Sequence, residues 1–186
     1  MEGIATVCVC ISGFLRNSKI QQEIISLLSQ KFNVLLADKN ELSESVCCQN
    51  GFDDGKPPII VTLSKAAGHI KAKNSILVLG SETKPALPDI TCENAVGVVL
   101  SDDKASACLL ASRSVPVIAC GSSSKDTITY SSLTDETIMV SLCRCLESFS
   151  GKTVEPLEFS MKAPESESVY PVLCTAAVLA LCDMLQ

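Results

Sequence analysis

The chain has 186 residues, and its 21 acidic and 15 basic side chains give a net charge of −6. This acidity, together with an aromatic content of only 4%, argues against DNA or RNA as the main partner and against binding to an anionic membrane surface. Hydrophobic residues make up 47% of the sequence, which excludes global disorder and suffices for one domain over residues 1–186.

Neither end of the chain shows an export or membrane signal. The N-terminus lacks the basic start and cleavage site of a signal peptide. The longest apolar stretch, Val169–Cys182, is about 14 residues long, whereas a spanning helix needs roughly 20. The 11 cysteines lie mostly in apolar runs, where free cysteine behaves as a small buried hydrophobe. We therefore expect a soluble, cytoplasmic protein whose thiols are reduced.

The N-terminal segments read as a strand, a helix and a second strand. Ile4–Ser12 is a β-rich run, and Asn17–Phe32 has apolar residues at helical spacing, with Asn17 or Ser18 as its N-cap. Asn33–Asp38 is the second strand. This order favours a parallel pair joined by a right-handed crossover.

The next segments are shorter. Glu41–Gln49 is consistent with a short helix, and Asn50–Pro58 with a turn-rich linker. Ile59–Leu63 and Ile76–Leu79 are predicted strands, separated by a polar stretch that holds the only histidine, His69.

A second strand–helix–strand unit follows. Asn94–Leu100 and Val115–Cys120 are predicted strands, and Asp103–Ser112 is the helix between them. The repeated pattern predicts an α/β fold with a Rossmann-like, doubly wound, mostly parallel sheet over about residues 1–121.

The pattern changes over about residues 122–186. Thr127–Leu133, Thr137–Glu147 and Thr153–Ser160 alternate apolar and polar residues, which predicts an antiparallel β-meander. Val169–Leu185 is nearly all apolar and predicts a buried C-terminal helix.

Polar loops follow four of the predicted parallel strands, and ligands of open α/β sheets bind at the carboxyl ends of strands. The candidate ligand-binding residues are Ser12, Gly13, Gly80, Ser81, Glu82, Ser101, Asp102, Asp103, Gly121, Ser122, Ser124, Lys125 and Asp126.

Each loop also has a structural interpretation. The hydroxyls, amides and Lys125 of Gly121–Asp126 suit an anion, but no helix follows, so the loop also fits a corner between strands. Ser101–Asp103 suits a metal ion or a ribose, but Asp102 or Asp103 also fits a helix N-cap. Ser12–Lys19 lacks the glycine pair of a phosphate loop and reads as an ordinary turn.

The thiols and His69 give no catalytic motif. Cys8-x-Cys10 and Cys143-x-Cys145 would offer four zinc ligands if their strands met, although zinc ligands usually lie on turns. Cys47–Cys48 is the pair most expected to be exposed, and no base is evident beside it. We expect no catalytic residue, no metal site and no cofactor.

Two segments, 94–121 and 169–181, resemble the second half of the central domain of Mur ligases, the ATP-dependent amino-acid ligases of peptidoglycan synthesis. Val98–Asp103 stands where that family has an Asn-Ala-Asp-Asp-like strand end. Val115–Gly121 matches its Val-Pro-Val-Ile-Thr-Phe-Gly-like strand, and Ala176–Ala177 the Ala-Ala of its last helix. The resemblance implies the central-domain fold and a bacterial protein related to cell-wall metabolism.

The chain departs from that family at its catalytic motifs. The Gly-x-x-Gly-Lys-Thr-Thr loop, the Thr-Asn-x-x-x-Asp-His stretch and the metal-binding lysine segment are absent, and Ser166–Tyr170 replaces the His-Asn pair. Nothing then remains to orient a γ-phosphate, so ATP and Mg²⁺ are not expected. The favoured hypothesis is a non-catalytic domain that binds a protein, including a second copy of itself, or a small ligand. The alternative is a small nucleotide- or phosphometabolite-binding enzyme with its site at the strand ends.

Overall fold

The structure is a computed structural model, and it describes residues 7–15, 18–37, 41–42, 55–63, 69–87 and 89–185. In chain order the elements are β1 (Val7–Ser12), α1 (Lys19–Lys31), β2 (Asn33–Ala37), β3 (Glu41–Leu42), β4 (Pro58–Leu63), β5 (His69–Leu79), β6 (Asp89–Leu100), α2 (Lys104–Ala111), β7 (Val117–Cys120), β8 (Ile128–Leu133), β9 (Thr137–Leu142), β10 (Leu146–Glu147), β11 (Thr153–Val154), β12 (Leu157–Lys162) and α3 (Tyr170–Leu181).

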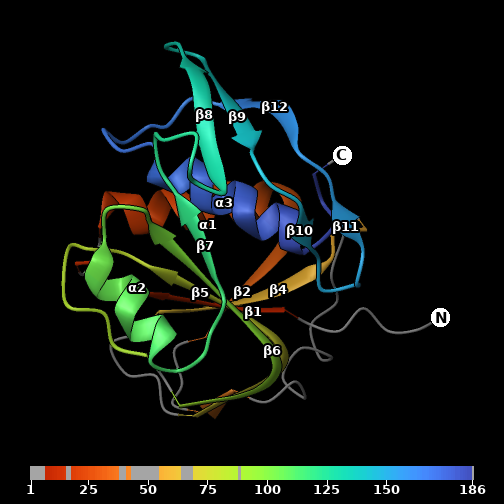
Figure 1. The fold of residues 1–186 in the computed structure, drawn as a ribbon. Helices are drawn as coiled ribbons and strands as arrows, with labels where there is room; N and C mark the ends of the chain where they lie inside the picture. Colours follow the sequence, from red (N-terminus) through yellow and green to blue (C-terminus); the bar gives the residue numbers. More distant parts are fainter. Residues whose placement is uncertain are drawn as a thin grey trace.

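One mixed sheet organises the molecule (Figure 1). Its strand order is β12-β9-β8-β7-β6-β5-β1-β4-β2, and β3 pairs with β5 outside this path. The neighbours from β2 to β8 run parallel, whereas β8, β9 and β12 pair antiparallel. The chain is therefore an α/β protein with a largely parallel sheet, an antiparallel extension and a C-terminal helix.

β1 is buried along its whole length because both faces of the sheet are covered there. On one face Val9 and Ile11 pack into a cluster with α1 and α3, and on the other face Cys8 and Cys10 pack with Leu110 of α2. Figure 1 shows α1 and α3 together on one face and α2 on the other.

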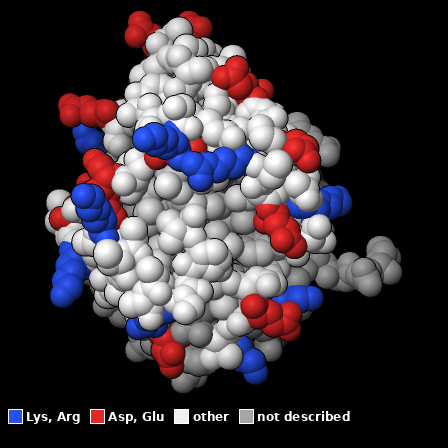
Figure 2. Space-filling model, in the orientation of Figure 1, with Lys and Arg blue, Asp and Glu red and all other residues white. Residues whose placement is uncertain are grey.

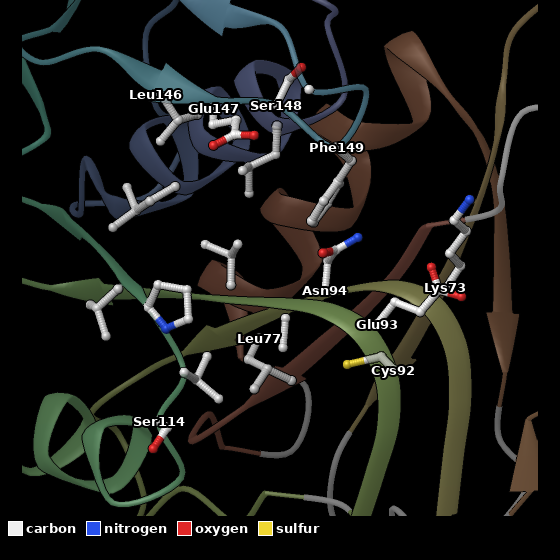
Figure 3. Close-up of a pocket in the computed structure, with 18 of the residues that line it drawn as sticks. Lys73, Leu77, Cys92, Glu93, Asn94, Ser114, Leu146, Glu147, Ser148 and Phe149 are labelled. Carbon is white, nitrogen blue, oxygen red and sulfur yellow. The ribbon is translucent and has the colours of Figure 1, made fainter.

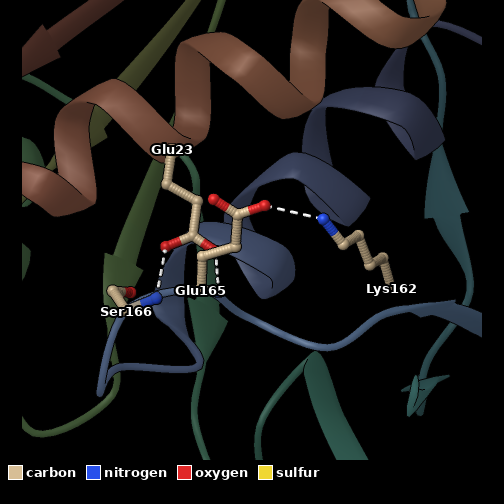
Figure 4. Close-up of polar contacts among 4 residues, drawn as sticks. All are labelled: Glu23, Lys162, Glu165 and Ser166. Atoms are coloured by element: carbon tan, nitrogen blue, oxygen red, sulfur yellow. Dashed lines mark hydrogen bonds and ion pairs between the residues drawn. The ribbon is translucent and has the colours of Figure 1, made fainter. Parts of the chain in front are cut away.

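Helix α1 begins where Ser18 caps it, since the Ser18 hydroxyl accepts the Gln21 N–H at 3.5 Å. Its buried face includes Glu23, whose carboxylate accepts the backbone N–H groups of Glu165 at 2.6 Å and Ser166 at 3.0 Å (Figure 4). Hydrogen bonds to an ionised acceptor are stronger than neutral ones. Glu23 thus fixes the loop that leads into α3.

Helix α3 is buried along its whole length, as its apolar sequence predicts. Pro171 lies in the first turn, where a helix needs no backbone donor. The helix packs against α1 and the sheet. In the part of the chain that the structure describes, no helix has the length and apolar character needed to cross a membrane.

Four predictions about the parallel region were wrong. β1 and β2 do not pair with each other, because β4 lies between them. Glu41–Leu42 forms a strand against β5 rather than the start of a helix, and residues 43–54 lie outside the described part. The polar stretch around His69 belongs to β5, and β6 begins at Asp89 rather than Asn94.

The predicted meander is also divided differently. Thr137–Glu147 splits into β9 and β10, and Thr153–Ser160 into β11 and β12. Pro156 lies within the second break, and proline cannot donate to a strand ladder. β10 and β11 pair with each other as a separate hairpin.

Candidate functional site

The loops predicted to form a binding site share one edge of the sheet. β7, β6, β5 and β1 are neighbours in that order and run parallel, so their carboxyl ends lie together. The loops after them are Gly121–Asp126, Ser101–Asp103, Gly80–Glu82 and Ser12–Gly13. Many polar groups of these loops, however, are hydrogen-bonded to one another or to neighbouring residues.

At the β1 and β5 ends, the predicted polar side chains are hydrogen-bonded to backbone. The Ser12 hydroxyl donates to the carbonyl oxygen of Ala86 at 2.8 Å and accepts the Ala86 N–H at 3.1 Å. The Leu15 N–H donates to Glu82 Oε2 at 2.8 Å. Ser81, by contrast, is exposed.

The two glycines of this region allow a close approach of two turns. Gly13 has a positive φ of 84°, and a Cβ there would overlap the carbonyl oxygen of Gly80. A Cβ on Gly80 would overlap the ring of Phe14. The Thr83 N–H also donates to the Gly13 carbonyl oxygen at 2.8 Å. The space beside these strand ends is therefore filled by protein atoms.

Two aromatic rings complete this filling. Phe14 and Tyr170 stack with ring centroids 6.4 Å apart, and both rings are buried. The Tyr170 hydroxyl lies 2.8 Å from the carbonyl oxygen of Leu79 and 3.0 Å from that of Val98. Burial raises the pKa of Tyr170 well above its usual value, so the hydroxyl remains a donor.

At the β6 and β7 ends, Asp126 holds the neighbouring loops together by hydrogen bonds. Its carboxylate is buried and accepts the Ser123 N–H at 2.9 Å and the Ser101 hydroxyl at 3.3 Å. A Cβ on Gly121 would overlap both Ser101 and Asp126. This contact fixes the loop after β7 onto the end of β6, as expected of a structural corner.

Asp103 is the N-cap of α2, one of the two interpretations of Ser101–Asp103. Its carboxylate accepts the Ser106 N–H at 3.1 Å and the Ser106 hydroxyl at 2.6 Å. Five predicted residues of this half are exposed at the edge: Ser101, Asp102, Ser122, Ser124 and Lys125.

The charge of the predicted residues disfavours an anionic ligand. The set holds four carboxylates, those of Glu82, Asp102, Asp103 and Asp126, and one ammonium, that of Lys125. A phosphate at this edge would meet a net negative charge rather than the cationic donors that usually bind it.

The thiols do not form the metal site considered from the sequence. Cys8 and Cys10 are buried, and burial raises the pKa of Cys10 to about 12. Cys143 and Cys145 lie between β9 and β10 rather than within a strand, and Cys145 is exposed. Among the described residues, no three His, Cys, Asp or Glu side chains are grouped to hold a metal ion. Cys47–Cys48 lies outside these residues, and none of the nine described cysteines forms a disulfide.

A cavity of about 1040 Å³ lies at the opposite, amino-terminal edge of the parallel strands. It lies between the first half of β6, the turn from α2 to β7, and the β10–β11 hairpin (Figure 3). None of the predicted site residues lines it. In Figure 2 the centre of this face is hollowed and free of charged side chains, which lie around its margin.

The cavity exists because two neighbouring strands differ in length. β6 begins at Asp89, but its first pair with β7 is Gly97 with Val117. The β10–β11 hairpin belongs to a separate sheet and lies beside this gap. The cavity thus occupies the position that a longer β7 would fill.

Both sides of the cavity have apolar walls, and charged residues lie among its lining. The apolar residues on the α1–α3 face are Leu146, Phe149 and Leu181, and those on the α2 face are Leu77, Leu87 and Val115. The charged lining residues are Lys73, Glu93, Arg113 and Glu147.

The floor carries the Asn94 amide and the Cys92 thiol. Asn94 Nδ2 donates to Asn74 Oδ1 at 2.9 Å across β6 and β5. Burial raises the pKa of Cys92, so its thiol is neutral at pH 7. Sequence reasoning missed this site because it placed the β6 start at Asn94. The β-branched residues Ile90 and Thr91 were the signal for an earlier start.

Comparison with known proteins gives no assignment. No protein-family model matches the chain, and no curated protein matches its sequence.

Proposed function

We propose that the chain is a non-catalytic, Mur-ligase-like α/β domain that binds a partner protein or a small ligand in the amino-edge cavity. The helices on both faces support a Rossmann-like, doubly wound class for it. A place near bacterial cell-wall metabolism follows from the resemblance of segments 94–121 and 169–181 alone. Location in the cytoplasm stays a prediction from the sequence.

The observation that carries this proposal is the filled carboxyl edge. In open α/β sheets this edge normally holds the ligand. Here Phe14 packs against Gly80 and stacks on Tyr170, while Asp126 closes the neighbouring loop onto Ser101. A nucleotide would have to displace buried side chains, and the loop after β1 has no Gly-Lys pair to bind its phosphates, since Ser18 precedes Lys19.

The alternative is a small nucleotide- or phosphometabolite-binding enzyme at the same edge. Its support is the convergence of four loops and the exposure of Ser122, Ser124 and Lys125. It requires the loops to separate, because their inner polar groups are already hydrogen-bonded.

Thermal unfolding with and without Mg-ATP and Mg-ADP separates the two candidates. A ligand at 100 times its Kd adds about 2.7 kcal/mol to the free energy of unfolding. For a chain of this length that raises the Tm by roughly 5–10 °C. The proposal predicts no shift and no release of phosphate from ATP. A shift of several degrees with either nucleotide would favour the alternative.

A further inference from the structure

The amino-terminal half of β6 has a strand neighbour on one side only within the described chain. β6 pairs with β5 from Asp89 to Val98, but with β7 only from Gly97 onward. The Gly97 N–H donates to Pro116 at 2.8 Å on the β7 side. In a parallel strand, alternate residues direct their N–H and C=O groups to the same neighbour.

By this alternation, Glu93 and Ala95 direct their main-chain groups toward the gap. No described residue pairs with them there. An unpaired strand edge is a template for another strand. The edge therefore offers donors and acceptors at the spacing of an extended peptide.

The cavity runs along this edge. Residues 92–96 all line it. At the rise of a strand, five residues span about 16 Å. A cavity of about 1040 Å³ is at the upper end of the size of ligand pockets. The space thus accommodates a short extended segment beside β6.

The walls indicate which side chains that segment carries. Successive residues of a strand point to opposite faces of the sheet. Leu146 and Phe149 belong to the apolar cluster of one face, and Leu77 and Val115 to that of the other. A strand in the gap would therefore find apolar residues on both faces of the sheet, as a buried central strand does.

We infer that the amino-edge cavity binds an extended, mainly apolar segment of about five residues from a partner protein, by β-augmentation along residues 92–96. The inference rests on the proposed function, since it names the class of partner for that cavity. A rigid apolar small molecule would contact the apolar walls but leave the main-chain groups of Glu93 and Ala95 without hydrogen bonds.

The test uses displayed random heptapeptides selected on the whole protein and counter-selected on Ala95→Pro. This variant removes the cavity-facing N–H without removing a hydrogen bond of the sheet, so it should fold. Ala95→Val keeps the N–H and is the matched control. We expect selected peptides rich in apolar residues that bind the wild type and Ala95→Val alike, and bind Ala95→Pro at least about tenfold more weakly.

Synthetic versions of a selected peptide provide a readout that does not depend on the variant's folding. N-methylation at alternate positions should weaken binding at least about tenfold, because only every second N–H faces β6. Hydrogen exchange at Glu93 and Ala95 should slow in the complex.

The inference is overturned if no peptide distinguishes wild type from Ala95→Pro, or if all N-methylated peptides bind equally. If Mg-ATP also causes no thermal shift, such a result rejects peptide binding in the cavity but leaves the proposal of a non-catalytic domain intact. A nucleotide shift rejects the proposed function itself.

Discussion

Replacing Tyr170 by Phe removes one oxygen atom from the centre of the filled edge and changes little else. The hydroxyl is buried and lies 2.8 Å from the Leu79 carbonyl oxygen and 3.0 Å from that of Val98. A lost intramolecular hydrogen bond costs about 1 kcal/mol, and leaving a buried acceptor unpaired costs about 1–3 kcal/mol. We therefore expect the free energy of unfolding to fall by about 1–3 kcal/mol.

The chain offers one matched control, because it has only two tyrosines. Tyr130→Phe removes the same atom from a half-buried ring on β8 and should change stability by less than about 0.5 kcal/mol. Since the protein has no tryptophan, urea unfolding is best followed by far-UV circular dichroism. Equal losses in the two variants would refute the role assigned to Tyr170.

Three further predictions concern the same framework. Gly13→Ala should lower the free energy of unfolding in urea by at least about 2 kcal/mol more than Gly151→Ala does. Both positions have a positive φ, but only the Cβ at position 13 would meet protein atoms. Equal losses would contradict the close approach of the Gly13 and Gly80 turns. Glu23→Gln should lower the free energy of unfolding by about 1–2 kcal/mol, because the Glu23 carboxylate accepts two backbone N–H groups. Glu165→Gln removes one partner of an exposed ion pair and should leave the urea midpoint unchanged. Burial raises the pKa of Cys10 from 9.0 to about 12. The stability that this thiol contributes is therefore fully present below pH 9 and is lost between pH 9 and 12, by about 1.4 kcal/mol per pH unit. A urea midpoint that stays constant from pH 8 to 10.5 would contradict this prediction.

The best-predicted parts of the fold are those where local pattern and burial agree. The all-apolar stretch after Val169 requires cover on every side, and α3 is buried throughout. Gly121–Asp126 follows a strand without leading into a helix, and it is a hydrogen-bonded corner. For α3 the residue types left few alternatives, whereas for the loop the lack of a following helix favoured a corner over an anion site.

The errors arose where pairing between distant segments decides the outcome. The polar residues around His69 give no strand signal alone, yet His69 and Ile70 pair with β3, and β5 pairs with β6 from His69 to Val78. The error in strand order has the same cause, since nothing in the sequences of β1 or β2 shows that β4 will lie between them. The cavity depends on the difference in length between β6 and β7, and therefore could not be found from either strand separately.

Native cysteines allow a direct measurement of the central claim, that the carboxyl edge is closed and the amino-edge cavity is open. Cys120 is buried at the carboxyl end of β7, Cys92 and Cys145 line the cavity, and Cys108 is exposed on α2 as the reference. The folded protein is treated with methyl methanethiosulfonate at about pH 8, and peptide mass spectrometry follows each thiol. The account predicts modification of Cys92, Cys145 and Cys108, with Cys120 protected until the protein unfolds. Modification of Cys120 as fast as Cys108, or protection of both cavity thiols, would contradict it.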